Sequence, residues 1–176
     1  MKNAARLALC GIITALSVVL LFFGGIAFVL AYIMPMLVGL FAIMIKRIFS
    51  TASAWMTYAA TSVLSFILVA DKECMLMYVM FFGFYPIIHD SLNKIKVTPL
   101  RAAVKFLIFN ITVSAAQLLL FYVFGIPFLE DGEGKWLIIL FAILMNILFV
   151  MYDRLLITLT KLYEIKLEKK IKKFFK

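Results

Sequence analysis

The sequence predicts an all-α membrane protein, a bundle of six transmembrane helices with both the N and C termini in the cytoplasm. Three observations predict this fold. The 176 residues are 66% hydrophobic, with a mean hydropathy of +1.11, whereas soluble domains are about 45–50% apolar. Several charge-free runs approach or exceed the roughly 18 residues that a membrane span needs. The basic residues gather in short loops and at the chain ends, outside those runs.

The first charge-free run contains two predicted spans. It extends from Leu7 to Ile45, and as one helix it would be about twice as long as the hydrocarbon core is thick. Gly24 and Gly25 are the natural point of reversal, so we expect spans over residues 7–23 and 26–45. A cleavable signal peptide is the alternative interpretation of the first of these, but the apolar stretch is longer than a usual signal sequence and continues into another span.

The third and fourth predicted spans lie on either side of a charged turn. The third covers residues 50–70 and stops at Asp71, Lys72 and Glu73. The fourth covers residues 74–88, which is short for a bilayer, so we expect its helix to begin among the charged residues at the interface.

The remaining chain holds two spans, a long internal loop and a tail. Residues 89–105 are polar and basic, and Pro99 should interrupt any continuous helix there. The fifth and sixth spans follow at residues 106–126 and 136–154. The transmembrane domain then covers residues 1–160, and the basic cytoplasmic tail, residues 161–176, can lie on the membrane as an amphipathic helix.

The distribution of basic residues predicts the orientation. With six spans, every Lys and Arg except Lys72 and Lys135 falls on the side of the termini, and the basic side of a membrane protein faces the cytoplasm. The formal charge of +9 therefore has a topological cause and does not indicate nucleic-acid binding. The chain is expected to be a multi-pass protein of the bacterial cell membrane, whose basic tail also attracts anionic membrane lipid.

A row of small residues marks the first helix. Ala4, Ala8, Gly11 and Ala15 are spaced by three or four residues, so they share one helical face. Small residues let another helix approach closely, and close packing drives helix association in lipid. Two interpretations stay open: this face packs inside the six-helix bundle, or it docks a separate membrane subunit.

Polar and aromatic residues in the later spans are the candidates for a ligand site. Amides cannot stay unpaired in hydrocarbon, so they should face the bundle interior, where interhelical hydrogen bonding alone would explain most of them. The alternative is a polar pocket near the outer ends of the helices, under the acidic loop at residues 130–136, which is either a solvated turn or a lid. The candidate substrate-binding residues are Tyr78, Gln117, Tyr122, Trp136 and Asn146.

No pattern predicts catalysis. His89 and Asp90 could form a proton relay, but they stand at the cytoplasmic end of the fourth span, where a proline turn into the basic loop is the simpler interpretation. The predicted spans contain no ionisable group near their centres, as an ion-coupled carrier usually has. The sequence also has no phosphate-binding glycine loop, nucleophile elbow or zinc motif. We therefore expect neither an enzyme nor a metal protein.

This pattern resembles the substrate-binding membrane subunits, or S components, of bacterial energy-coupling factor (ECF) transporters. The most specific element is the first helix, where Ala4 with Ala8, and Gly11 with Ala15, are similar to the AxxxA-type motif that contacts the shared T component in that family. The resemblance implies six helices, capture of a vitamin or related small micronutrient from outside, and two cytoplasmic ATPases that supply energy. It implies no individual ligand-binding residue. The alternative is a noncatalytic membrane scaffold or assembly factor that holds other membrane proteins.

Overall fold

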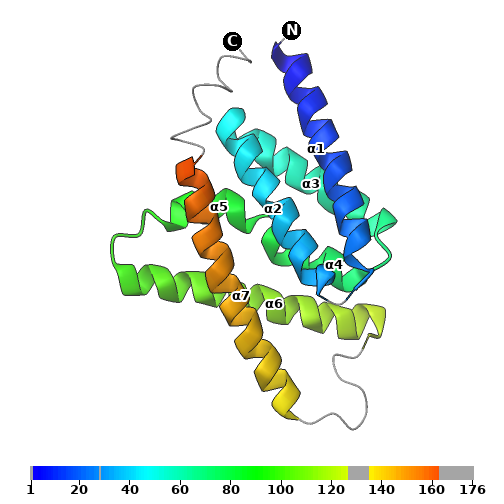
Figure 1. The fold of residues 1–176 in the computed structure, drawn as a ribbon, viewed down its shortest axis with the longest axis vertical. Helices are drawn as coiled ribbons and strands as arrows, with labels where there is room; N and C mark the ends of the chain where they lie inside the picture. Colours follow the sequence, from blue (N-terminus) through cyan, green and yellow to red (C-terminus); the bar gives the residue numbers. More distant parts are fainter. Residues whose placement is uncertain (1, 28, 127–134, 163–176) are drawn as a thin grey trace.

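The described part of the computed structural model, residues 2–27, 29–126 and 135–162, is helical and contains no β-strand. The helices in chain order are α1 (Lys2–Gly24), α2 (Leu30–Ile48), α3 (Thr51–Leu68), α4 (Lys72–Met77), the π-helical turn η1 (Tyr78–Phe82), α5 (Tyr85–Leu92), α6 (Thr98–Phe124) and α7 (Lys135–Leu162). The start of α1 and the end of α7 lie toward the same end of the molecule (Figure 1).

Five segments among the described residues are long and apolar enough to cross a membrane: α1, α2, α4 through α5, α6 and α7. The third predicted span forms a helix where it was expected, but α3 is not among the five. Its seven hydroxyl side chains lower its hydropathy, and they include Ser53, Thr57, Thr61 and Ser65, which are buried. That α3 also crosses the membrane stays a prediction.

The helices are longer than predicted around the basic loop. The fourth span was expected to end at residue 88, but α5 continues to Leu92. The fifth was expected to begin at residue 106, but α6 begins at Thr98 and contains Pro99 in its first turn. Pro99 therefore does not interrupt a helix, because a first-turn residue has no intrahelical partner for its N–H in any case. The loop shrinks to residues 93–97.

Local sequence explains several helix ends. The Ser50 hydroxyl accepts a hydrogen bond from Ser53 N at the start of α3 (3.2 Å), and the Asp71 carboxylate accepts from Glu73 N and Cys74 N at the start of α4 (2.9 and 3.2 Å). Such caps satisfy donors that have no partner inside the helix. Helix α6 stops at Gly125, whose φ of 64° is the left-handed conformation that glycine adopts most easily.

The core is centred on the segment from α4 through α5, the most buried of the five candidate spans. Helices α2, α3 and α6 pack directly against it. Phe81 and Tyr85 stack with ring centroids 4.6 Å apart, and Phe109 from α6 stacks on Phe149 from α7 at 4.7 Å. All four rings are almost fully buried, so a span that was short by sequence becomes the centre of the fold.

The central segment is not a regular helix, and neighbouring tyrosines compensate for the irregularity. In η1, Gly83 N donates to Tyr78 O (2.7 Å), five residues back, so Val79 O loses its usual donor. The Tyr58 hydroxyl of α3 donates to Val79 O instead (2.8 Å). Pro86 has no N–H for Phe82 O, and the Tyr152 hydroxyl of α7 lies 3.4 Å from that oxygen. Both carbonyls thus have donors.

Gly39 is expected to be irreplaceable, because a Cβ atom there would lie 2.3 Å from Phe82 O and 2.4 Å from the Tyr152 hydroxyl. Gly39→Ala should lower the free energy of unfolding by about 1–3 kcal/mol through overpacking, measured as a fall in thermal midpoint in detergent. Gly11→Ala is the matched control, since nothing lies within 4 Å of the place that its added methyl group would take and alanine favours a helix. Equal midpoints for the two variants would contradict the close approach of α2.

Candidate functional site

A pocket of about 450 Å³ lies between α6 and α7. Three of the predicted substrate-binding residues line it: Gln117 and Tyr122 from α6, and Asn146 from α7. The rest of the wall is mainly apolar and aromatic and includes Phe109, Val113, Leu118, Phe121, Ile138, Phe141 and Met145. Apolar walls with a few polar groups are typical of small-molecule sites, so this is the candidate ligand pocket.

A pair of asparagines at the edge of the pocket joins the two helices. The Asn110 amide donates to Asn146 Oδ1 (3.0 Å), and the Asn146 amide donates to Asn110 Oδ1 (3.2 Å). Each nitrogen also donates to its own helix, to Phe106 O (2.9 Å) and to Ala142 O (2.8 Å). The expected interhelical bonding is confirmed for this pair, and both side-chain nitrogens have their donors in use.

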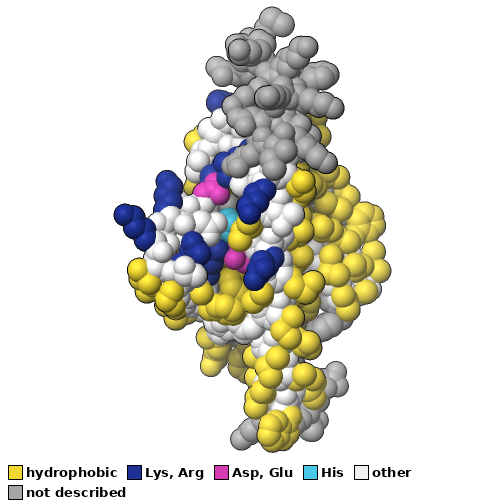
Figure 2. All heavy atoms as spheres, turned by 60° about the vertical axis from the view of Figure 1, so that its left-hand side comes forward, with side chains coloured by type: hydrophobic (Ala, Val, Ile, Leu, Met, Phe, Trp, Pro, Cys, Tyr) yellow, Lys and Arg dark blue, Asp and Glu magenta, His cyan; other side chains and the backbone are white. Residues whose placement is uncertain are grey.

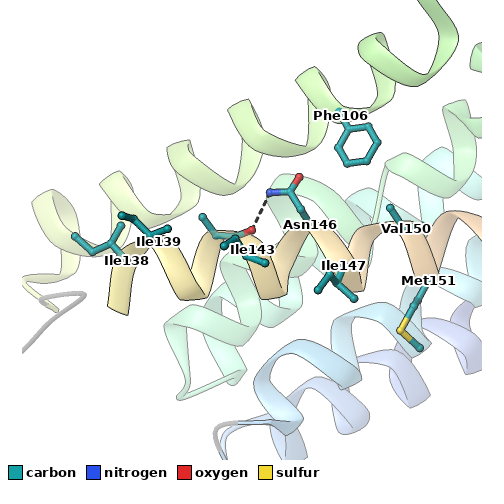
Figure 3. Close-up of a pocket in the computed structure, with 9 residues that line it drawn as sticks. Phe106, Ile138, Ile139, Ile143, Asn146, Ile147, Val150 and Met151 are labelled. Atoms are coloured by element: carbon teal, nitrogen blue, oxygen red, sulfur yellow. Dashed lines mark hydrogen bonds between the residues drawn. The ribbon is translucent and has the colours of Figure 1, made fainter. Parts of the chain in front are cut away.

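A second hollow, of about 660 Å³, lies along α7 on the other side of Asn146. Figure 3 shows Phe106 of α6 facing a row of α7 side chains there, with Asn146 bonded back to its own helix. The rest of its lining is apolar: Ile138, Ile139, Ala142, Ile143, Ile147, Val150 and Met151. Such a surface suits lipid chains and offers little that would select a polar ligand.

One end of the candidate ligand pocket adjoins a carboxylate. Gln117 Nε2 donates to Glu73 Oε1 (3.3 Å), and the hydroxyl of the buried Tyr32 donates to the same oxygen. Phe141, another lining residue, packs edge-on against the Tyr32 ring with centroids 5.8 Å apart. Glu73 therefore stands one hydrogen bond behind the pocket wall. The sequence analysis missed this position because it placed Glu73 only among the charged interfacial residues at which the fourth helix begins.

The other two predicted substrate-binding residues do not line this pocket. Tyr78 is buried in the core, where its ring lies 6.0 Å from that of Tyr58. Trp136 is 81% exposed at the start of α7. Of the loop proposed as a lid, residues 130–134 lie outside the described residues and residues 135–136 form the start of α7. The tail beyond residue 162 also lies outside the described residues.

The small-residue face of α1 points away from the other described helices. Ala4, Ala8, Gly11 and Ala15 are all exposed, and a Cβ at Gly11 would meet no atom within 4 Å. The opposite face of α1, with Thr14, Ser17, Val18 and Leu21, is buried. Packing of the small-residue face within the described bundle is therefore wrong, and docking of another subunit stays a prediction.

A buried charged cluster joins α5, α6 and α7. Asp153 accepts hydrogen bonds from the Tyr85 hydroxyl (2.6 Å) and the Lys105 amine (2.8 and 2.9 Å), and its Oδ1 lies 3.1 Å from His89 Nε2. Tyr85, His89 and Lys105 are buried. Asn93 contacts the imidazole from the next turn (3.3 Å). Figure 2 shows the single histidine among acidic and basic side chains on one face of the molecule.

Asp90 belongs to a separate ion pair. It accepts from Lys46 (2.8 Å) and Arg47 (3.1 Å) at the end of α2, and Lys46 also donates to Ile87 O (2.7 Å). In the structure His89 therefore bonds Asp153 and not its sequence neighbour Asp90. Both charged clusters join helices to one another. The one sequence pattern that could have predicted the Asp153 cluster was the four-residue spacing of Tyr85 and His89, which places these two side chains on one helical face.

Comparison with protein-family models, curated proteins and solved structures found no match to this chain.

Breaking the Asp153 cluster should be costly. Lys105→Met should reduce the free energy of unfolding by about 3 kcal/mol, because it leaves a partly buried carboxylate without its cation. Lys96→Met, at an exposed position, is the control and should change stability little. Thermal unfolding in detergent measures both.

The double variant Lys105→Met with Asp153→Leu should recover much of the loss, since it removes both charges together. A single variant as stable as the control would show that Lys105 and Asp153 do not form the buried pair.

Proposed function

We propose that this protein is a membrane-embedded substrate-binding subunit of an ECF-type importer. In this proposal it captures a vitamin or related small micronutrient from outside and docks on a T component, while cytoplasmic ATPases supply the energy. The observation that carries the proposal is the pocket between α6 and α7, where Gln117, Tyr122 and Asn146 meet.

The dimensions and chemistry of the pocket fit a small organic molecule. Its volume of about 450 Å³ lies within the range of roughly 300–1,000 Å³ typical of small-ligand sites. Aromatic side chains such as Phe121, Tyr122 and Phe141 supply apolar contact area, and Gln117 supplies a polar group. A vitamin-sized ring system with few polar groups matches such a wall.

The exposed face of α1 supports docking. Ala4, Ala8, Gly11 and Ala15 form a smooth strip with no described helix over it. In lipid such a strip lets a second helix approach until the backbones are in contact, and that packing drives association. The T component is the partner that the resemblance of this helix implies.

The proposal includes the full six-span topology in a bacterial cell membrane. Five candidate spans are apolar, and we add α3 as the sixth because its hydroxyl face packs on α1 and α2. With six spans the basic ends and loops face the cytoplasm, and the pocket near Gln117 and Tyr122 belongs to the outer half. Membrane lipid would cover the many exposed apolar side chains of α6 and α7.

A noncatalytic scaffold is the second candidate function. The same exposed face of α1 favours it, because a scaffold also needs an uncovered docking strip. Retention of a small molecule separates the two functions. Native mass spectrometry of the purified chain should show a bound vitamin-sized mass if the protein is a substrate-binding subunit. A stable complex with an unrelated membrane protein and no ligand would favour the scaffold.

Ala8→Leu should abolish capture of a coexpressed T component, because a large side chain prevents close approach of the partner helix. Ala103→Leu is the matched control, an equally exposed alanine on α6, and it should leave capture unchanged. Copurification with a tagged T component and the ATPases measures the effect. Thermal midpoints should be equal for the two variants, so loss of capture cannot come from unfolding. Undiminished capture by Ala8→Leu would rule out this face as the contact.

A further inference from the structure

The acidic residue behind the candidate ligand pocket has hydrogen-bond donors but no cationic partner among the described residues. Glu73 Oε1 accepts from Gln117 Nε2 (3.3 Å) and from the Tyr32 hydroxyl. Within the described residues, no Lys or Arg lies within ion-pair distance of Glu73. Its neighbour Lys72 turns away and donates to Phe66 O (3.2 Å) and Val69 O (2.9 Å).

This arrangement differs from that of Asp90 and Asp153, whereas the partly buried Asp71 accepts from the backbone N–H groups of Glu73 and Cys74 and also has no ion pair within the described residues. Asp90 faces Lys46 and Arg47, and Asp153 faces Lys105. A carboxylate held between a buried tyrosine and a pocket-lining amide, with no such partner, leaves negative potential on that side of the pocket.

Most of the polar groups on the pocket wall can accept a hydrogen bond from a ligand. Gln117 donates one of its two N–H groups to Glu73, and its oxygen is left as an acceptor. The Ser114 and Tyr122 hydroxyls on the same wall can accept as well as donate. The donors of Asn110 and Asn146 are already in use, toward each other and their own helices. Among the described residues, the lining contains no Lys, Arg or His. An anion would find no countercharge there, whereas a cation or hydrogen-bond donor would.

We propose that the pocket between α6 and α7 takes an organic cation, a mainly apolar small molecule whose ammonium or charged ring is balanced by Glu73. This inference rests on the proposed function and specifies its substrate class. The aromatic rings of Phe121, Tyr122 and Phe141 in the wall suit such a ligand, because ring faces attract organic cations.

A bare metal ion is a poorer occupant. Magnesium and calcium need six or more oxygen ligands, and this end of the pocket offers the oxygens of Glu73, Gln117 and Tyr32, of which the Tyr32 hydroxyl is already donating. A neutral apolar molecule would fit the walls but would gain nothing from the carboxylate.

The test uses two probes of equal shape, phenyltrimethylammonium and its uncharged carbon analogue tert-butylbenzene. Binding to the full chain in nanodiscs is measured by ligand-observed NMR, with empty nanodiscs subtracted to remove partitioning into lipid. The wild-type chain should bind the cation at least about tenfold more tightly than the neutral probe. Glu73→Gln should remove that preference, so that the two probes bind with equal affinity.

Glu73→Asp keeps the charge and should retain part of the preference, and it replaces Glu73→Gln as the test if the latter does not fold. Equal binding of the two probes by the wild-type chain, or a preference that survives in Glu73→Gln, would overturn the charge inference and leave the pocket as a site for neutral ligands. Failure of the wild-type chain to bind either probe, together with absence of a retained small molecule, would overturn the proposed function and this inference with it.

Discussion

The central segment from α4 through α5 must satisfy its backbone in a place without water. Pro86 and the π-helical turn at Tyr78–Phe82 each deprive one carbonyl of its usual donor. In hydrocarbon an unpaired carbonyl costs several kcal/mol, so a neighbour has to supply the missing donor. The Tyr58 hydroxyl of α3 and the Tyr152 hydroxyl of α7 supply these donors. Gly39 of α2 has no side chain and so leaves room for the Tyr152 hydroxyl beside Phe82 O. The positions of α2, α3 and α7 around this segment follow from that requirement.

The need to supply donors to the carbonyls of the central segment also explains the position of the candidate ligand pocket. Helix α7 is held to the core through Tyr152, Phe149 and the Asp153 cluster, all in its second half. Its first half has mostly exposed apolar side chains, and the Asn110–Asn146 pair is its polar contact with α6. Two helices that touch at one crossing diverge on either side of it. The space beyond the crossing becomes the candidate ligand pocket, which borders the core at Phe109, Val113 and Met145.

Sequence periodicity and charge predicted where the helices lie but not what surrounds each of them. Helix existence was predictable because long apolar runs have few alternatives. The fourth span is hydrophobic on all sides, so its pattern could not show that it would be the core, nor that Tyr78 would be buried in it. The sequence alone does not distinguish a proline in a loop from a proline in the first turn of a helix. For this reason the start of α6 was placed too late in the chain, and Lys105 was assigned to a loop although it is buried. Gln117, Tyr122 and Asn146 meet because they sit on neighbouring helices near the crossing.

The two charged regions of the central segment bear on how the protein could work. Glu73 stands at its beginning and His89 near its end, about 24 Å apart along a helix, which approaches the thickness of the hydrocarbon core. No carboxylate, imidazole or amine lies between them in the segment, and the Tyr85 hydroxyl is committed to Asp153. A continuous row of carboxylate, imidazole or amine groups along this segment is therefore missing, which agrees with the proposed function, in which the chain binds its ligand at one end and separate ATPases supply the energy. In that proposal the exposed strip on α1 is the surface through which the T component contacts the chain.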